Sequence, residues 1–297
     1  MTPAVLGVDI GSTASKAVVL GDGRVLAATV VPVGAGTTGP GRAIRAVLAE
    51  AGLERAAISR TVATGYGRNT LAQADRQVSE LSCHARGATA LWPGVRTVID
   101  VGGQDAKVLS IDASGRLTSF VMNDKCAAGT GRFLEVIARA LELDVTELAQ
   151  AGASAAAPVE ISSTCTVFAE SEVISHLAAG SPIADIVAGI HASVASRFAG
   201  LARRVAPQPP LVMTGGVANN VEVVARLSER LGLEIAISPR SQLAGALGAA
   251  LYAQEDATQP GGIGHEPVAK PAPQTNYLTG QLGPCTAGGP ARKGCVT

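Results

Sequence analysis

Aromatic side chains and excess charge are both scarce in this 297-residue chain. Tryptophan, tyrosine and phenylalanine make up 3% of the residues, which leaves few surfaces on which single-stranded nucleic acid could stack. Basic and acidic residues number 24 each, so the formal net charge is zero and no general affinity for nucleic acid or an anionic membrane surface is expected. With 47% hydrophobic residues, the composition instead predicts a globular protein of one large or two ordinary domains.

Long apolar runs and paired cysteines are also missing. No uninterrupted apolar run approaches the roughly 18 residues that a membrane-spanning helix needs, and a strand-like pattern begins at Val5 without a signal peptide before it. The five cysteines are odd in number and widely spaced, which argues against a disulfide framework and a self-contained zinc ribbon. They are Cys83, Cys126, Cys165, Cys285 and Cys295. These absences predict a cytoplasmic protein that binds no membrane.

A short pattern, Asp-x-Gly-x-x-x-x-Lys, occurs twice, at residues 9–16 and 100–107, each time directly after an apolar run. Both copies continue into another apolar run, so each predicts a β-hairpin whose glycine-rich tip offers backbone N–H groups to an anion. Either copy alone is compatible with a hairpin that merely has a favourable turn. Two copies with matched internal spacing indicate two similar lobes that face one polyphosphate.

The remaining pattern predicts a duplicated α/β lobe, because strands and helices recur in the same order after each tip. We expect a first lobe in residues 1–94, a second lobe in 95–240 and a C-terminal connecting helix in 241–256. Residues 257–297 hold eight glycines and six prolines, a level that is typical of disorder, so this tail with Cys285 and Cys295 is expected to lie apart from the site. The Gly-x-x-x-x-Gly-Lys-Ser/Thr motif of P-loop proteins is absent.

These motifs resemble those of the acetate kinase, sugar kinase, Hsp70 and actin superfamily. Residues 9–16 are similar to its first phosphate motif, 100–105 to its second and 211–217 to its adenosine motif. Residues 80–88 and 245–250 are similar to its two connecting helices, in which small residues let the helices cross closely and act as a hinge. The resemblance implies a duplicated, ribonuclease H-like, two-lobed ATPase fold of the α/β class.

The same resemblance implies ATP and Mg²⁺ between the lobes. Asp9 and Asp100 stand at strand ends, where carboxylates suit Mg²⁺ held through water, and together with Gln104 they are expected to act in catalysis by orienting the attacking water. The residues expected to contact the nucleotide are Gly11, Ser12, Thr13, Ala14, Ser15, Lys16, Gly102, Gly103, Gln104, Asp105, Gly215, Gly216, Val217, Asn219, Gln242 and Gly245.

Two cysteines each precede a predicted helix. Cys126 lies in a small-residue loop before residues 131–143, and Cys165 directly precedes residues 166–179, whose larger apolar side chains are expected to share one face. A helix N-terminus carries partial positive charge and unpaired N–H groups, which favour the thiolate that binds metal. Two such cysteines can equally be small buried residues. They supply half the ligands of a four-iron cluster, and a twofold homodimer would supply all four.

The segments 123–133 and 162–170 resemble those of the activator component of 2-hydroxyacyl-CoA dehydratases, within the BadF/BadG/BcrA/BcrD ATPase family. The resemblance implies that Cys126 and Cys165 of two subunits hold one oxygen-sensitive [4Fe–4S] cluster. ATP hydrolysis would drive single-electron transfer from this cluster to a 2-hydroxyacyl-CoA dehydratase, such as 2-hydroxyglutaryl-CoA dehydratase. The implied partners are a second copy of the chain, the dehydratase and an electron donor such as ferredoxin or flavodoxin.

Two alternatives stay open. The chain could be an ATPase subunit of a benzoyl-CoA reductase-type complex, or, in another class, a small-molecule kinase with the sugar kinase fold. No catalytic role is expected for the histidines: His84 follows Cys83 in a connecting helix, where a structural role is predicted, and His176 and His191 lie in helices without a triad of acidic neighbours.

Overall fold

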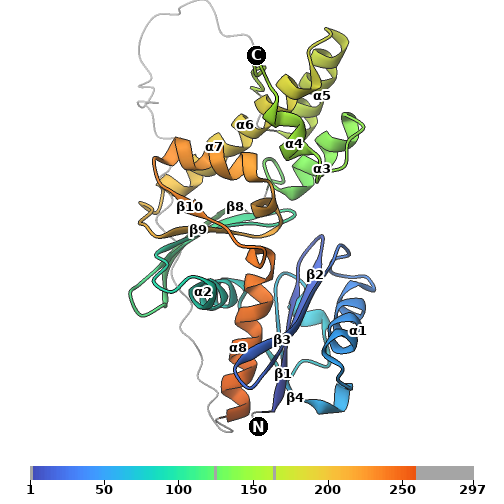
Figure 1. Cartoon of the computed structure of the whole chain (residues 1–297), viewed down its shortest axis with the longest axis vertical. Helices are drawn as coiled ribbons and strands as arrows, with labels where there is room; N and C mark the ends of the chain where they lie inside the picture. The colour runs from blue at the N-terminus through green and yellow to red at the C-terminus, as the bar shows by residue number, and fades with distance from the viewer. Residues whose placement is uncertain (1–2, 124–125, 163–164, 259–297) are drawn as a thin grey trace, which may run out of the picture.

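Two lobes, each built on one five-stranded sheet, make up the computed structural model, which describes residues 3–123, 126–162 and 165–258 (Figure 1). The strand orders are β3-β2-β1-β4-β5 and β8-β7-β6-β9-β10. In the first sheet, β1 pairs antiparallel with β2 on one side and parallel with β4 on the other. In the second sheet, β6 pairs in the same way with β7 and β9, so the second sheet repeats the first. This repetition confirms the predicted two-lobed ribonuclease H-like fold.

The first lobe places its sheet between two helices. Its elements are β1 (Ala4–Ile10), β2 (Ser15–Gly21), β3 (Arg24–Val31), α1 (Gly39–Ala51), η1 (Arg55–Ala57), β4 (Ile58–Thr64), η2 (Arg68–Thr70) and β5 (Arg76–Gln77). Helix α1 packs on one face of the sheet and α8 (Ala244–Thr258) packs on the other. Strand β1 is therefore buried on both faces, which explains why it reads as a continuous apolar run rather than an alternating one.

The second lobe is larger because more helices follow its hairpin. Its elements are β6 (Thr97–Val101), β7 (Ala106–Ile111), β8 (Leu117–Asn123), α3 (Gly131–Ala140), α4 (Leu148–Ala153), α5 (Thr166–Ala178), α6 (Ile183–Arg203), β9 (Leu211–Thr214), η3 (Gly216–Asn219), α7 (Val221–Leu231), β10 (Ile235–Ala236) and η4 (Ser241–Leu243). Helix α6 buries Ile186, Ile190 and Phe198 in the core of this lobe. Helices α3, α4 and α5 lie together at the end of the molecule farthest from the N-terminus (Figure 1).

The lobes are joined where α2 (Glu80–Leu91) crosses α8. At this crossing the backbones touch: a Cβ on Gly87 would lie 1.9 Å from the Ala244 carbonyl oxygen, and one on Gly248 would lie 1.8 Å from the Cys83 carbonyl oxygen. Only glycine allows such an approach. Helix α2 also packs on the second sheet through Ala85 and Ala88, so one helix contacts both lobes.

The part of the chain that the structure describes contains no helix long and apolar enough to cross a membrane. The predicted tail lies almost entirely outside the described residues, since α8 continues to Thr258 and the description stops there.

Candidate functional site

A cleft of about 960 Å³ lies between the two sheets and is lined by both repeated tips. Of the residues predicted to act on or contact a nucleotide, sixteen line it: Asp9, Gly11, Ser12, Thr13, Ala14, Lys16, Asp100, Gly102, Gly103, Gln104, Asp105, Gly215, Gly216, Val217, Asn219 and Gln242. Ser15 and Gly245 are not among the lining residues. Ser15 is buried and donates to the Val33 carbonyl, and Gly245 packs behind Asp9 and His84.

The first tip, between β1 and β2, presents Lys16 to the cleft. Asp9 and Lys16 are register partners across the hairpin, and Lys16 Nζ lies 3.1 Å from Asp9 Oδ2. Burial would lower the pKa of Lys16, but Asp9, together with Asp100 and Glu80, raises that pKa above its usual value. The other carboxylate oxygen of Asp9 is buried and accepts no hydrogen bond from any described residue. The tip therefore presents one ammonium group to the cleft, and behind it lies a buried carboxylate oxygen that has no hydrogen-bond partner among the described residues.

The second tip, between β6 and β7, is organised differently. Asp100 and Lys107 are again register partners, but Lys107 is buried and does not line the cleft. Its Nζ lies 2.8 Å from Asp105 Oδ2, 2.9 Å from Glu80 Oε1 and 3.6 Å from Asp100 Oδ2. Burial would lower the pKa of Lys107, yet these three carboxylates raise it well above its usual value. Lys107 thus stabilises the second tip through these ion pairs and does not face the cleft.

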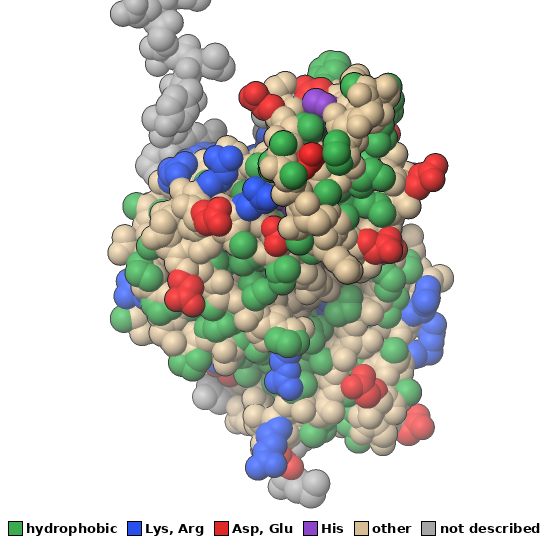
Figure 2. Space-filling view, turned by 45° about the horizontal axis from the view of Figure 1, so that its top comes forward, with side chains coloured by type: hydrophobic (Ala, Val, Ile, Leu, Met, Phe, Trp, Pro, Cys, Tyr) green, Lys and Arg blue, Asp and Glu red, His purple; other side chains and the backbone are tan. Residues whose placement is uncertain are grey.

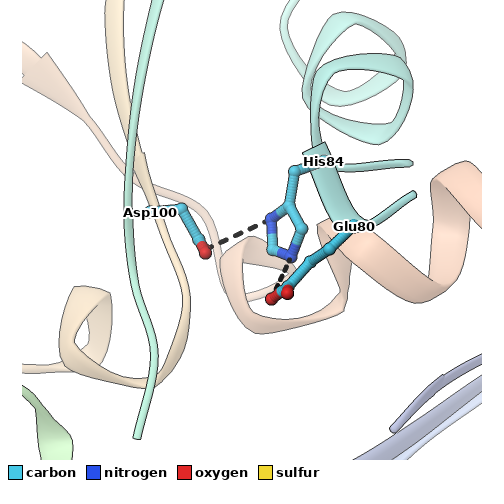
Figure 3. A group of neighbouring side chains, drawn as sticks. All are labelled: Glu80, His84 and Asp100. Atoms are coloured by element: carbon cyan, nitrogen blue, oxygen red, sulfur yellow. Dashed lines mark ion pairs between the residues drawn. The ribbon is translucent and has the colours of Figure 1, made fainter. Parts of the chain in front are cut away.

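Asp100 is held by partners on β9 and on α2, and Figure 3 shows the contact with His84 of α2. Thr214 at the end of β9 donates a hydrogen bond of 2.8 Å to Asp100 Oδ1, and His84 Nδ1 of α2 lies 3.2 Å from the same oxygen. Burial would raise the pKa of Asp100, but His84, Lys107 and the hydrogen bond from Thr214 lower it overall. The carboxylate is consequently ionised and oriented at the floor of the cleft.

Glu80, His84 and Asp100 form a group whose ligand atoms all lie within 4.8 Å of one another, close enough to hold a metal ion. The ammonium of Lys107 already contacts both carboxylates of this group, so the described side chains supply its positive charge. Sequence reasoning gave His84 a structural place in a helix and missed its position on the cleft. The i, i+4 spacing of Glu80 and His84, which puts both on one helix face, was the available signal.

The third wall is the turn after β9. Gly215 has φ +83°, and a Cβ there would lie 2.2 Å from the Val101 carbonyl oxygen, so the turn requires glycine. Asn219 Nδ2 lies 3.3 Å from Gln242 Oε1, which brings two predicted residues together. The cleft is also lined by Leu134 and Glu135 of α3 and by Val145, Thr146 and Ala149, which sequence reasoning missed because no motif marks them.

Asn220 extends this wall and connects it to a buried histidine. Its Oδ1 accepts from the Val223 N–H and caps α7, while its Nδ2 lies 3.1 Å from His191 Nε2. Burial, with a smaller effect of Arg226, lowers the pKa of His191 to about 4. His191 is therefore neutral at pH 7, and its Nε2 accepts from the Asn220 amide.

Neither predicted metal-binding cysteine lies on the cleft. Cys126 is half-buried between β8 and α3, and its carbonyl accepts from Asn123 Nδ2 at 3.0 Å. Cys165 is exposed and stands at the N-cap position of α5, as the sequence indicated. Residues 124–125 and 163–164, which belong to the same two segments, lie outside the described residues. Helices α3 and α5 pack against each other, so both cysteines belong to one end of the second lobe.

Helix α5 does not bury its apolar residues on one face, which corrects the prediction made for residues 166–179. Val173 is buried, but Val167, Phe168 and Ile174 are 66%, 65% and 53% exposed. Hydrophobic side chains are visible at this upper end of the molecule in Figure 2. These side chains are exposed because α5 has few neighbouring elements in the single chain, so only its inner side contacts the core. An exposed cysteine and an apolar surface thus share the start of one helix.

Comparison with known proteins gives one consistent result. The family model of the BadF/BadG/BcrA/BcrD ATPase family matches residues 6–253. The (R)-2-hydroxyglutaryl-CoA dehydratase activating ATPase of Acidaminococcus fermentans is 56% identical over 261 residues, which cover 87% of this chain and all of that protein. The solved activator of the 2-hydroxyisocaproyl-CoA dehydratase from Clostridium difficile, with bound ADPNP, is 53% identical and superposes with a TM-score of 0.84 over 86% of this chain and 96% of its own. A ROK family glucokinase from Streptomyces griseus shares the fold alone, at 16% identity and a TM-score of 0.52 over 85% of this chain and 99% of its own.

Proposed function

Because the chain belongs to the BadF/BadG/BcrA/BcrD ATPase family, we propose that it hydrolyses ATP between its lobes and thereby activates a 2-hydroxyacyl-CoA dehydratase. The named relatives are activators of such dehydratases, and one of them has ADPNP bound. The observation that carries the proposal is the pairing of two features in one lobe. A glycine-rich tip lines the cleft, and an exposed cysteine stands directly before a helix at the other end of the same lobe.

The cleft carries the acidic groups that a divalent cation requires and one lysine that faces the cleft. Four carboxylates, those of Asp9, Glu80, Asp100 and Asp105, face the ammonium groups of Lys16 and Lys107. The carboxylates thus outnumber the ammonium groups, which suits the binding of a divalent cation beside the phosphates. The Asp9 oxygen that lacks a hydrogen-bond partner is an acceptor suited to a water bound to Mg²⁺, and oxygen ligands are what Mg²⁺ prefers.

The proposed roles in hydrolysis follow from position. Lys16 and the small residues of both tips would hold the phosphates through N–H, hydroxyl and ammonium groups. Asp9 and Asp100 would orient Mg²⁺ and its waters, and the exposed Gln104, at the second tip, would orient the attacking water. The adenosine would lie between the Gly215 turn and the residues of α3 and α4.

A shared [4Fe–4S] cluster fits the cysteines of the described chain. Such a cluster takes four thiolates. Of the three cysteines among the described residues, Cys83 is buried in the helix crossing, which leaves Cys126 and Cys165. A second copy related by twofold symmetry would provide the other two, and the exposed Val167 and Phe168 beside Cys165 would then be covered. When bound, the cluster would supply a low-potential electron.

The proposed partners divide the reaction. A ferredoxin or flavodoxin would deliver an electron to the homodimer. The homodimer would use ATP hydrolysis to drive the transfer of this electron to the dehydratase. A nucleotide can favour one arrangement of the lobes only through different affinities for the two arrangements. The hinge for that change would be the close crossing of α2 and α8.

The proposal is tested by purifying the chain without air and measuring iron, the absorption spectrum and ATP binding. We expect an iron–sulfur spectrum that Cys126→Ser and Cys165→Ser both abolish, while ATP binding survives in both variants because neither residue lines the cleft. Full iron loading of the double variant would refute the cysteine assignment. A colourless wild-type chain that phosphorylates a small molecule would instead identify a kinase, and stable assembly only with non-identical ATPase subunits would favour a benzoyl-CoA reductase-type complex.

A further inference from the structure

A fully buried threonine, Thr130, lies between the second phosphate tip and the segment that carries Cys126. Its Oγ1 lies 2.9 Å from the Gly103 carbonyl oxygen and 2.5 Å from the Ala127 carbonyl oxygen. A hydroxyl has a single proton to donate, so the two carbonyls share it. One side chain therefore contacts the wall of the cleft and the cysteine loop at once.

The backbone on either side strengthens the connection to the cleft. The Gly131 N–H donates to the Gly102 carbonyl at 2.9 Å, and the Arg132 N–H donates to the Gly103 carbonyl at 2.7 Å. A Cβ on Gly131 would lie 3.2 Å from the Gly102 oxygen, so little room separates the two segments. The beginning of α3 is thus hydrogen-bonded to both glycines of the second tip.

The connection continues to the cysteine. The Thr130 N–H donates to the Ala127 carbonyl at 3.0 Å and closes the turn that follows Cys126. The Cys126 carbonyl in turn accepts from Asn123 at the end of β8. Cys126 is therefore held between the end of a strand and a turn whose far side is fastened to Gly103.

The geometry of one peptide unit links this connection to the cleft. The carbonyl of Gly103 and the N–H of Gln104 belong to one planar peptide unit, so they can only rotate together. When the Gln104 N–H turns toward or away from a phosphate in the cleft, the Gly103 carbonyl must change its direction relative to Thr130. The hydroxyl that follows this carbonyl also holds Ala127.

We propose that Thr130 is a positioning residue that conveys the occupancy of the nucleotide cleft to Cys126. The inference rests on the proposed function, since it describes how the nucleotide site would regulate the cysteine segment. Thr130 does not line the cleft and contacts no substrate, and its effect is exerted through Gly103 and Ala127.

Thr130→Val is the informative substitution because it removes the hydroxyl and retains the shape. Neither carbonyl would be left without a donor, since Gly103 keeps the Arg132 N–H and Ala127 keeps the Thr130 N–H. The fold and the cleft should survive. Thr130→Ser keeps the hydroxyl and serves as the conservative variant. Thr97→Val is the control, because Thr97 is a comparably buried threonine whose hydroxyl donates to the Gln208 carbonyl and accepts from the Gln208 N–H at the other end of β6.

The test compares two nucleotide states in the full chain. In protein purified without air, the rate of iron release to a chelator is measured with ADP and with a non-hydrolysable ATP analogue. In the iron-free chain, the alkylation rate of Cys126 is measured in the same two states by peptide mass spectrometry. Nucleotide affinity is measured for each variant, so that a loss of binding is recognised.

We expect the two states to give different rates in the wild type, in Thr130→Ser and in Thr97→Val. In Thr130→Val the ratio between the states should fall about fivefold or reach one, as expected for the loss of one hydrogen bond. A wild-type ratio that persists in Thr130→Val, or a wild-type chain with equal rates in both states, would overturn the inference. Absence of iron from the wild type would count against the proposed function, and the alkylation rates would still decide the role of Thr130.

Discussion

Lys16 and Lys107 occupy the same position in two repeated hairpins, each opposite an aspartate, yet only Lys16 faces the cleft. The side chain of Lys16 is 14% exposed and that of Lys107 is 2% exposed. The difference arises because α2 crosses the second tip and brings Glu80 onto Lys107, whereas no described acidic residue of a helix comes as close to Lys16. The lysine of the first copy of the motif therefore faces the cleft, whereas the lysine of the second copy stabilises the fold.

Substituting the two lysines should separate these roles. Lys16→Ala is expected to weaken ATP binding by about 10-fold to 100-fold, the effect of one charged hydrogen bond, and to lower stability less than Lys107→Met does, because it removes the cation from one carboxylate instead of three. Lys107→Met leaves Asp100, Asp105 and Glu80 without their shared cation, and it is expected to lower the free energy of unfolding by about 3–5 kcal/mol. Nucleotide titration and thermal unfolding of both variants measure this; equal effects of the two substitutions would contradict it.

The contact between the two tips makes a second prediction. A Cβ on Gly103 would lie 2.1 Å from the Thr13 hydroxyl, so Gly103→Ala should push the tips apart. Overpacking of this kind costs about 1–3 kcal/mol, and we expect ATP affinity to fall by about 10-fold to 100-fold. Gly200→Ala is the control, because its Cβ would meet no atom within 4 Å on α6 and helix propensity should even improve. An unchanged affinity in Gly103→Ala would mean that the tips separate freely when ATP binds.

The buried His191 predicts a defined dependence of stability on pH. The pKa of His191 is about 4 in the folded chain and near 6.5 in the unfolded chain. Between these pH values His191 binds a proton in the unfolded chain but stays neutral in the folded chain. This group should therefore reduce stability as pH falls from 6.5 to 4, by up to about 3 kcal/mol. His191→Gln should lose that part of the dependence in denaturant unfolding at pH 7 and pH 4.5, whereas His176→Gln should keep it.

The exposed start of α5 predicts the site of self-association. Phe168→Glu places a charge on this surface and should weaken the dimer by at least about tenfold, because truncating or charging a buried anchor of an interface costs about 2 kcal/mol or more. Leu26→Glu is the control, since Leu26 is a comparably exposed apolar residue on β3 of the other lobe. Analytical ultracentrifugation at several concentrations gives the dissociation constants. A dimer that tolerates Phe168→Glu would have its interface elsewhere.

Much of the fold could be predicted because its strands are buried on both faces and therefore read as apolar runs. The two tips were recognisable for the same reason, since each stands between two such runs. The spacing of Asp9 and Lys16 also fixes their pairing, because a hairpin with that turn must place them opposite each other.

Contacts made between distant segments could not be predicted in this way. His84 and Asp100 meet only because α2 packs on the second sheet, and nothing near His84 in the sequence indicates its partner. The wall formed by Val145, Thr146 and Ala149 likewise carries no motif. The exposure of Phe168 was missed because helical periodicity identifies an apolar face without showing whether anything covers it.

The central claim is that two chains share one inorganic centre, and native mass spectrometry of the anaerobically purified protein measures this most directly. We expect a species of two chains with one four-iron cluster, which Cys165→Ser converts to iron-free protein. Iron-free monomers, or one complete cluster on every chain, would contradict it.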